Sequence, residues 1–471
     1  MFGDFEAQRH WMEITYNLPV KEWYINTNNN DLLYWGLDYP PLTAYHSYLM
    51  GLVANHFNSS WIALASSRGL ENVHHKLFMR LTAILPFHLI YAPSMIYFVF
   101  YLTKRKGTPM NLMLAVILMY PGLLAIDNAH FQYNSVSLGL FLWSFLFLAN
   151  HRISFGSIFF VLAVNYKQME LYHALPIFTF IFSRCLKKPF KLHIIESVFT
   201  LLKVSIVVVS LFTLLWIPFI INGQQTVLAV LRRIFPFYRG LYEDKVASVW
   251  CSFSFLLRMN DHFSLDTQAV IVECIPTSSH YSAACVILAV LPSLCLLFLR
   301  PTVKNFKSSL IISSLVFSYF HSKCTRNLYF WQLYQLCYCY QSIAMQFFGS
   351  LIFQTQGSKS INGTIIIFSM FSLCLKDSNS LILAAFIAYY VTCSTFVEFS
   401  GKKLLMAYHL SCLAAVAICI LEWAIPPPAR YPHIFPLLNA LYSCVHFLGF
   451  LVYFYFEMVC YEYRVLVGRS M

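Results

Sequence analysis

The residues of this chain that could do chemistry lie in polar stretches of an otherwise apolar sequence. These stretches are residues 2–24 with the neighbouring 34–46, followed by 126–135, 165–176 and 231–250. Their candidate functional residues are Asp4, Glu6, Arg9, His10, Trp11, Asp38, Tyr39, His130, Gln132, Asn134, Lys167, Gln168, Glu170, His173, Arg232 and Arg233. A set of this kind is suited to proton transfer at a carboxylate, while nearby cations stabilise developing negative charge.

One carboxylate and several cations are enough to move a glycosyl group from a lipid phosphate to a hydroxyl. The carboxylate takes the proton of the acceptor hydroxyl, and the cations offset the charge on the departing phosphate. Because phosphate is already a good leaving group, no second carboxylic acid is needed, unlike in glycoside hydrolysis. The polar stretches therefore fit a lipid-linked sugar donor.

Motifs of other transfer chemistries do not occur in the sequence. It contains neither a DxD carboxylate pair nor a Gly-rich phosphate loop, which argues against a metal-bound nucleotide-sugar donor. Asp4 and Glu6 are the nearest approach to a metal-binding pair, and their spacing is not specific for a divalent cation. The 14 cysteines form no CxxC pair and have no Cys/His spacing suited to zinc. We predict no metal and no other cofactor.

Apolar helices must position these residues. Hydrophobic residues make up 59% of the chain and charged residues 11%, whereas roughly 25% charged residues are typical of soluble domains. Segments near the roughly 20 apolar residues needed to cross a bilayer recur from about residue 80 onward. We predict an all-α, polytopic integral membrane protein with spans near residues 81–102, 110–126, 135–150, 153–165, 171–184, 198–221, 281–299, 308–320, 380–399, 404–425 and 434–460.

The formal charge of +12 is informative through its distribution. Basic clusters follow three predicted spans, at residues 104–106, 184–191 and 300–307. If the spans alternate, these clusters share one side, which the positive-inside tendency assigns to the cytoplasm. Residues 1–80 and the other polar stretches then share the opposite face, which also carries the N-glycosylation pattern Asn58-Ser59-Ser60. The clusters are topological anchors, so we predict no nucleic-acid partner.

Six motifs carry a resemblance to a known family. They are GDFEAQRHWMEIT, YWGLDYPPLTAYHS, HKLFMR, HFQYNSVSLG, NYKQMELYHALP and RRIFPFYRGLYEDKVA. Together they resemble the endoplasmic-reticulum dolichyl-phosphate-glucose glucosyltransferases, in particular the members that add the first glucose to the high-mannose oligosaccharide on dolichyl pyrophosphate. The similarity runs from residue 2 to about residue 318 and resumes after about residue 360. Members that add the second glucose share the DYPP element but open with a different motif, so they match less well.

The resemblance implies a C-type membrane glycosyltransferase with lumenal loops forming the active site. It implies an inverting single displacement from dolichyl-phosphate-glucose to a lipid-linked oligosaccharide in the endoplasmic-reticulum membrane, without a metal. In that family the acidic residue of the first lumenal loop deprotonates the acceptor mannose hydroxyl. The matching residue is Asp4, and Asp38 is the second candidate. We predict substrate contacts for the other candidate residues named above.

Two departures from the family pattern affect the predicted domain organisation. Family members carry a transmembrane helix before the first motif, so we interpret residues 1–80 as a first lumenal loop with amphipathic helices whose leading span is missing. Residues 81–318 then form a transmembrane bundle with the lumenal motif loops. We interpret residues 319–360 as a frame-shifted segment, because a shifted reading frame yields the family's lumenal QVHEKS motif. Residues 361–471 are predicted C-terminal transmembrane helices.

Two other classes of protein remain alternatives at this stage. A lipid or solute transporter would also be polytopic, but it predicts paired charges at mid-bilayer depth and repeat symmetry between halves. We find neither in the sequence. A structural or chaperone-like membrane subunit leaves the loops that combine acids and bases unexplained. We therefore favour a glycosyltransferase.

Overall fold

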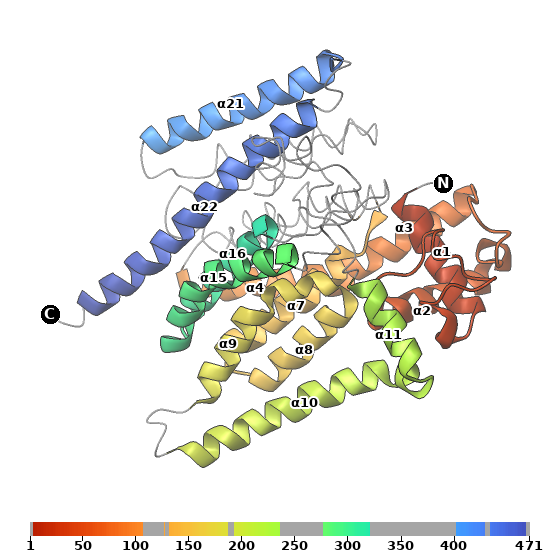
Figure 1. Ribbon diagram of the computed structural model, residues 1–471, viewed down its shortest axis with the longest axis horizontal. Helices are drawn as coiled ribbons and strands as arrows, with labels where there is room; N and C mark the ends of the chain where they lie inside the picture. The colour runs from red at the N-terminus through yellow and green to blue at the C-terminus, as the bar shows by residue number, and fades with distance from the viewer. Residues whose placement is uncertain are drawn as a thin grey trace. The chain divides into compact units, whose positions relative to one another are not determined.

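A computed structural model describes residues 3–106, 127, 131–186, 193–235, 277–320, 402–428 and 434–467. Within these ranges the helices are joined by turns and loops (Figure 1), and the only β-structure is an isolated bridge between Thr27 and Asn30. The all-α prediction is thus confirmed for this part of the chain. The chain divides into two compact units, of which the first comprises Met1–Tyr101, Leu123–Leu171 and Arg184–Tyr238.

Three helical stretches in the described ranges are long and apolar enough to cross a membrane. They are Val73–Tyr101, Ile194–Ile221 and Leu437–Val465, and they coincide with the spans predicted near 81–102, 198–221 and 434–460. Shorter apolar helices occur at Asn134–Ala149, Ile153–Tyr166, Ala284–Leu299 and His409–Ala424. The spans predicted at 110–126 and 380–399 lie outside the described residues, as does the predicted frame-shifted segment 319–360 apart from its first two residues.

The first unit opens with a polar helix that is buried rather than solvated. Helix α1 (Asp4–Asn17) begins after Gly3, whose φ of 70° suits a residue without a Cβ. Its first turn carries Asp4 and Glu6, which interact favourably with the positive end of the helix dipole. Residues 5–15 of this helix are all buried. Its polar groups must therefore be satisfied by protein partners.

Helix α2 packs along α1, and α3 reaches α1 through the rings of Phe5 and His75. Helix α2 (Pro41–Phe57) starts with proline at its first position, where the missing N–H costs nothing. Gly51 lets α2 approach α1 closely, because an added Cβ would lie 2.9 Å from the Met12 carbonyl oxygen. Helix α3 (Val73–Pro86) is capped by Asn72, which accepts from the backbone N–H groups of His74 and His75 at 2.8 and 3.2 Å.

The first apolar stretch continues from α3 through a π-helical turn. This turn, η3 (Phe87–Tyr91), follows Pro86, which cannot donate a backbone hydrogen bond within the helix. Helix α4 (Ala92–Lys106) then completes the stretch. A core cluster of buried residues, including Phe5, Met12 and Phe131, packs where α1, α2 and α3 meet the segment before α7. The start of α1 is thereby held beside that segment.

Helices α7 (Asn134–Ala149) and α8 (Ile153–Tyr166) form an antiparallel hairpin in the first unit (Figure 1). The two helices touch closely at Gly156, where an added Cβ would lie 2.5 Å from Leu148 Cγ. Helix α10 (Ile194–Ile221) packs against α8, and Trp216 Nε1 donates to Asn165 Oδ1 at 2.8 Å. Helix α11 (Gln224–Ile234) follows Gly223, whose φ is 96°.

The second unit contains the remaining described helices. They are α9 (Ala174–Cys185), most of which belongs here, with α15 (Thr277–Leu299), α16 (Val303–Phe320), α21 (Lys402–Ala424) and α22 (Ile434–Val467). Stacked rings of Phe180 and Phe306, with centroids 4.2 Å apart, join α9 to α16. Arg300 pairs with Glu462 at 2.6 Å, which ties α22 to the connection between α15 and α16. This unit therefore combines apolar packing with an ion pair at the helix ends.

Candidate active site

Asp4, the predicted catalytic base, lies at the start of α1 and is half-buried. Its Oδ2 accepts a hydrogen bond from Gln132 Nε2, 128 residues further along the chain. Gln132 lies just before α7 and is 3% exposed. The structure thus brings together two residues that the sequence predicted for one site.

Lys167 lies behind this contact, directly after α8, and only 2% of it is exposed. Its Nζ donates to Asn134 Oδ1, and to Gln132 Oε1 at 3.3 Å. The same nitrogen lies 5.0 Å from the centroid of the Tyr39 ring, which is a cation–π distance. Lys167 therefore contacts three other residues of the predicted site.

Asp127 is a buried carboxylate that the sequence analysis did not single out. Its oxygens accept from Asn134 Nδ2 at 2.8 Å and from the backbone N–H groups of Asn134 and Ser135 at 3.2 and 2.6 Å. These are orphan donors at the N-terminus of α7, where an anion is favoured. Burial raises the pKa of Asp127 to about 6, and the Ser135 N–H, the Lys167 charge and Asn134 limit the rise. We call Asp4, Asp127, Gln132, Asn134 and Lys167 the Asp4 network.

The segment around Asp38 and Tyr39 borders this network through backbone contacts. Gln168 Nε2 donates to the Asp38 carbonyl at 3.3 Å, and Tyr24 donates through its hydroxyl to the Tyr39 carbonyl at 2.7 Å. Arg233, at the end of α11, donates to the carbonyls of Leu37 and Gly36 at 3.1 and 2.9 Å. Two predicted site residues, Gln168 and Arg233, thus hold the backbone of this segment.

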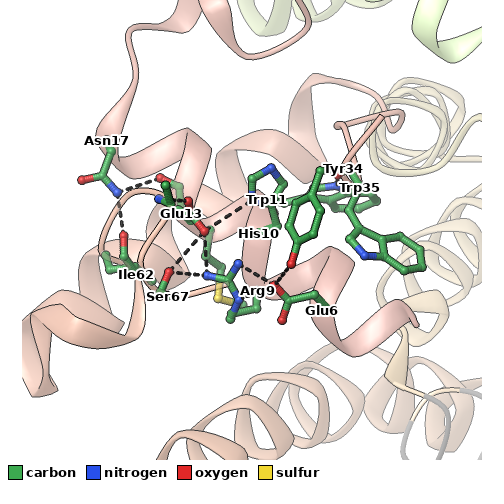
Figure 2. Close-up of polar contacts among 12 residues, drawn as sticks. Glu6, Arg9, His10, Trp11, Glu13, Asn17, Tyr34, Trp35, Ile62 and Ser67 are labelled. Carbon is green, nitrogen blue, oxygen red and sulfur yellow. Dashed lines mark hydrogen bonds and ion pairs between the residues drawn. The ribbon is translucent and has the colours of Figure 1, made fainter. Parts of the chain in front are cut away.

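Four other residues of α1 were predicted to contact the substrate, and all four make buried interactions within the protein (Figure 2). Arg9 is fully buried and pairs with Glu6 at 2.6 Å and with Glu13 at 2.7 Å. Arg9 also donates to Ser67 Oγ at 2.5 Å, and His10 Nδ1 lies 3.3 Å from Glu13 Oε2. We call Glu6, Arg9, His10, Glu13 and Ser67 the Arg9 cluster. Through Ser67 the cluster links α1 to a following loop, and the substrate contacts predicted for Glu6, Arg9 and His10 stay predictions.

Glu13 is the second buried acid that the sequence analysis missed. Burial by itself would raise its pKa, but the His10 hydrogen bond, the Arg9 charge, the Ala65 backbone N–H and the His10 charge together lower it to about 2. The Ala65 N–H donates to Glu13 Oε1 at 2.7 Å. Trp11, on the same helix, donates from Nε1 to the Trp35 carbonyl at 2.8 Å. Glu13 is therefore ionised, and the Arg9 cluster is tied to a following loop through Ser67 and the Ala65 N–H.

The remaining predicted residues lie in different surroundings. Glu170, in the 3₁₀ helix η5 (Gln168–His173), is buried and accepts from Ser137 Oγ at 2.9 Å. His173 belongs to the second unit, where its Nε2 lies 2.8 Å from Ser314 Oγ. Arg232 is exposed on α11. His130 lies outside the described residues.

Potential metal ligands are not grouped in the described part of the chain. No three His, Cys, Asp or Glu side chains there are placed so that they could hold a metal ion. The Asp4 and Glu6 carboxylates instead face Gln132 and Arg9, respectively. The positive charge within the Asp4 network comes from Lys167. This arrangement offers a carboxylate for proton transfer beside a buried cation.

Known proteins resemble the chain over nearly its whole length. A probable dolichyl pyrophosphate Man9GlcNAc2 alpha-1,3-glucosyltransferase of Caenorhabditis elegans is 46% identical over 97% of this chain and 83% of its own. The dolichyl pyrophosphate Man9GlcNAc2 alpha-1,3-glucosyltransferase of Gallus gallus is 39% identical over 96% of this chain and 90% of its own. A probable enzyme of the same name from Schizosaccharomyces pombe is 34% identical, over 96% and 84% of the respective chains.

The family comparison agrees with these individual relatives. Residues 1–453 match the ALG6, ALG8 glycosyltransferase family, a range that includes every candidate residue of the site. The resemblance inferred from the six sequence motifs is thereby confirmed. The chain belongs to the ALG6, ALG8 glycosyltransferase family of membrane glycosyltransferases.

Proposed function

We propose that this chain is the α-1,3-glucosyltransferase that adds the first glucose to Man9GlcNAc2 on dolichyl pyrophosphate. The donor is dolichyl-phosphate-glucose, and transfer takes place at the lumenal face of the endoplasmic-reticulum membrane. Relatives from animals and fission yeast that carry this enzyme name support the proposal, since each matches 96% or more of the chain. The observation that carries it is the half-buried Asp4 carboxylate, bound by Gln132 beside the buried Lys167.

The reaction is a single displacement at the anomeric carbon of glucose. Asp4 takes the proton of the mannose 3-hydroxyl as that oxygen attacks C1. The new C1–O bond forms opposite the phosphate, the old C1–O bond breaks, and dolichyl phosphate leaves with the electron pair. Inversion that yields an α-linked product requires a β-linked donor. Asp4 returns its proton to water after the product departs.

The leaving phosphate needs positive charge nearby but no proton. Arg232 is exposed on α11, next to Arg233, which holds the backbone before Asp38. We assign Arg232 to the donor phosphate, and the substrate contacts predicted separately for His130 and His173 stay predictions. Cationic side chains stabilise such developing charge without a metal ion. Asp38 remains the second candidate for the base.

Asp4→Asn tests the assignment of the base. The asparagine keeps the shape of the side chain but cannot accept the proton, so the rate of glucose transfer should fall about 10²- to 10⁴-fold. The assay uses purified protein in liposomes with dolichyl-phosphate-glucose and Man9GlcNAc2 on dolichyl pyrophosphate. Full activity of the variant, expressed at the level of the unmodified protein, would reject Asp4 as the base.

The same assay separates the proposed function from its alternatives. An enzyme that adds the first glucose converts Man9GlcNAc2 to a product with one added hexose. An enzyme that adds the second glucose would instead extend an acceptor that already carries one glucose. A transporter would move a labelled lipid or solute without forming any new glycosidic bond. Only the first result agrees with the proposal.

A further inference from the structure

We propose that Lys167 and Gln132 position the catalytic base Asp4 and do not bind the donor phosphate. Lys167 orients the Gln132 amide, and the amide in turn holds the Asp4 carboxylate. This inference rests on the proposed function, because it assigns Asp4 as the base. It departs from the expectation that Lys167 and Gln132 contact the substrate, and it depends on how the Asp4 network is connected.

Chemistry determines the orientation of the two amides in this network. An ammonium group can only donate hydrogen bonds, so the oxygens of Gln132 and Asn134 must face Lys167 Nζ. The nitrogens of the two amides then point the other way, toward carboxylates. Gln132 Nε2 donates to Asp4, and Asn134 Nδ2 donates to Asp127 at 2.8 Å. One cation therefore orients two amides toward two acids.

Burial argues against a phosphate contact for Lys167. Lys167 is 2% exposed, and its Nζ faces the oxygens of Gln132 and Asn134 and the ring of Tyr39. Among the described residues, the Lys167 ammonium donates to these two amide oxygens, and the Tyr39 ring lies at a cation–π distance from it. A phosphate that reached this nitrogen would have to enter this buried site and compete with these contacts. Asp4, by contrast, is half-buried and lies at the accessible end of the network.

At the end of the network away from Asp4, Asp127 is fixed to the start of α7. Asp127 accepts from the first backbone N–H groups of α7, and its own backbone carbonyl accepts from the Gln132 N–H at 3.1 Å. Asn134 Nδ2 also lies 3.3 Å from Gln132 Oε1. The Gln132 side chain is thus anchored at its carbonyl end by Lys167 and Asn134. Only its N–H₂ group is left to hold Asp4.

Removing the Lys167 ammonium should leave the Asp4 carboxylate in the protein but displaced from its position for taking the acceptor proton. Without Lys167, the Gln132 amide can turn its oxygen toward Asp4, which repels a carboxylate instead of binding it. A displacement of about 1 Å in a reacting group can cost on the order of 10²-fold in rate. The affinity for the donor should not change, since neither residue touches it.

Lys167→Met and Gln132→Met test this inference in purified enzyme reconstituted in liposomes. Each variant keeps the length of the side chain and removes its polar group. We expect kcat to fall about 10- to 100-fold, with the KM for dolichyl-phosphate-glucose within twofold of the unmodified enzyme. Combining the two changes should lower kcat no further, because both act through one path. Lys21→Met, which removes an exposed lysine, is the matched control.

The variant Asp127→Asn/Lys167→Met separates positioning from simple charge compensation. Lys167→Met alone leaves Asp127 buried without its nearby cation, and this could unfold the protein. The double variant removes both charges. If Lys167 only neutralises Asp127, the double variant should regain full kcat, which would overturn the inference. If Lys167 positions Asp4, kcat should stay low in the folded double variant.

Other outcomes would also overturn the inference. A raised KM for the donor with unchanged kcat would make Lys167 a phosphate contact. If the kcat losses of Lys167→Met and Gln132→Met multiply in the double variant, the two residues act separately. Should Lys167→Met not fold, Gln132→Met decides alone, and an unchanged kcat there contradicts positioning. Failure of the proposed function looks different, because the unmodified enzyme would then transfer no glucose, or Asp4→Asn would remain active.

Discussion

At the scale of single residues, the polar side chains of the first motif form two separate groups of contacts. Asp4 belongs to a network that leads through Gln132 to Lys167, and it is the part of that network nearest the surface. Glu6, Arg9 and His10 belong to the Arg9 cluster, where they bind one another and Ser67. A single helical segment thus carries both the proposed base and an ion-paired cluster that is hydrogen-bonded to Ser67 of a following loop.

The Arg9 cluster should be essential for stability. Arg9→Met leaves the buried carboxylates of Glu6 and Glu13 without their cation, and breaking a buried pair in this way costs about 3–5 kcal/mol. We expect a clear fall in Tm in a thermal unfolding measurement in detergent. Glu196→Gln is the control, since its pair with His193 is exposed and 3.7 Å long and contributes about 0–1 kcal/mol. Equal Tm values for the two variants would contradict the role of the cluster.

Asp127 and Glu13 should each make the stability of the protein depend on pH, in opposite directions. The pKa of Asp127 rises from 3.8 to about 6 on folding, so its stabilising contribution is complete below 3.8 and is lost as pH rises through 6. For Glu13 the pKa falls to about 2, so its contribution is complete above 4.5 and is lost as pH falls toward 2.

Asp127→Asn isolates the first of these effects. The variant removes the titrating group and leaves Glu13 in place, so the Glu13 contribution cancels in the comparison. The Tm of the unmodified protein minus that of the variant should decrease between about pH 4 and pH 6.5 and then stay level. Thermal unfolding of both proteins across this range checks the prediction. A difference that does not vary with pH would show that Asp127 keeps its ordinary pKa.

At the scale of helices, the position of Asp4 depends on how α1 packs against its neighbours. α1 is buried along residues 5–15, and α2 reaches it at Gly51, where no side chain intervenes. The Arg9 cluster fixes the same helix to the loop that contains Ser67. The segment before Asp38 is held by Arg233 of α11. The candidate site is therefore assembled from helix starts and loops.

Gly51→Ala tests the close approach of α1 and α2. The added Cβ would lie 2.9 Å from the Met12 carbonyl oxygen and 3.1 Å from Tyr16 Cβ, so the helices must separate. We expect a loss of about 1–3 kcal/mol and reduced glucose transfer, because α1 carries Asp4. Gly449→Ala on α22 is the matched control, since nothing lies within 4 Å of its added Cβ. Unchanged Tm and activity in Gly51→Ala would mean that this packing is not needed.

At the scale of the whole molecule, the proposed function requires the candidate site to lie on the lumenal side. The basic clusters after three predicted spans predict, by the positive-inside tendency, that residues 1–80 lie on the non-cytoplasmic side. The acceptor pattern for N-glycosylation lies in this part of the chain. Asn58 and Ser60 are both exposed, and Ser60 donates to Asn58 Oδ1 from its backbone N–H at 3.0 Å and its hydroxyl at 2.7 Å. Modification there would report the orientation.

We expect Asn58 to carry a glycan when the chain is expressed in eukaryotic cells. The measurement is a gel-mobility shift removed by an N-glycosidase, made with Asn362→Gln because Asn362-Gly363-Thr364 is a second acceptor pattern. Asn58→Gln and Ser60→Ala should each abolish the shift. Ser59→Ala is the control and should keep it, since the middle position of the pattern accepts any residue except proline. A shift that persists in Asn58→Gln would contradict modification at this residue.

Several features of the protein could be predicted from the sequence by itself. A bilayer requires long apolar segments whose backbone bonds are satisfied internally, so composition determined the helical class and the spans at 81–102, 198–221 and 434–460. The motifs likewise identified the family, since they hold the same residues in the same local order. Of the Asp4 network, the sequence identified Asp4, Gln132, Asn134 and Lys167, because polar residues stand out between apolar spans.

Only the tertiary structure decided which of these residues contact one another. Asp4 and Gln132 are 128 residues apart, and Gln132 and Lys167 are 35 apart, so no local pattern could pair them. Asp127 and Glu13 were missed because their roles come from burial and from donors supplied by other segments. Hydrogen-bond partners and desolvation depend on which segments pack together. For that reason Lys167, predicted to contact the substrate, is found bound to Gln132 and Asn134 next to the proposed base.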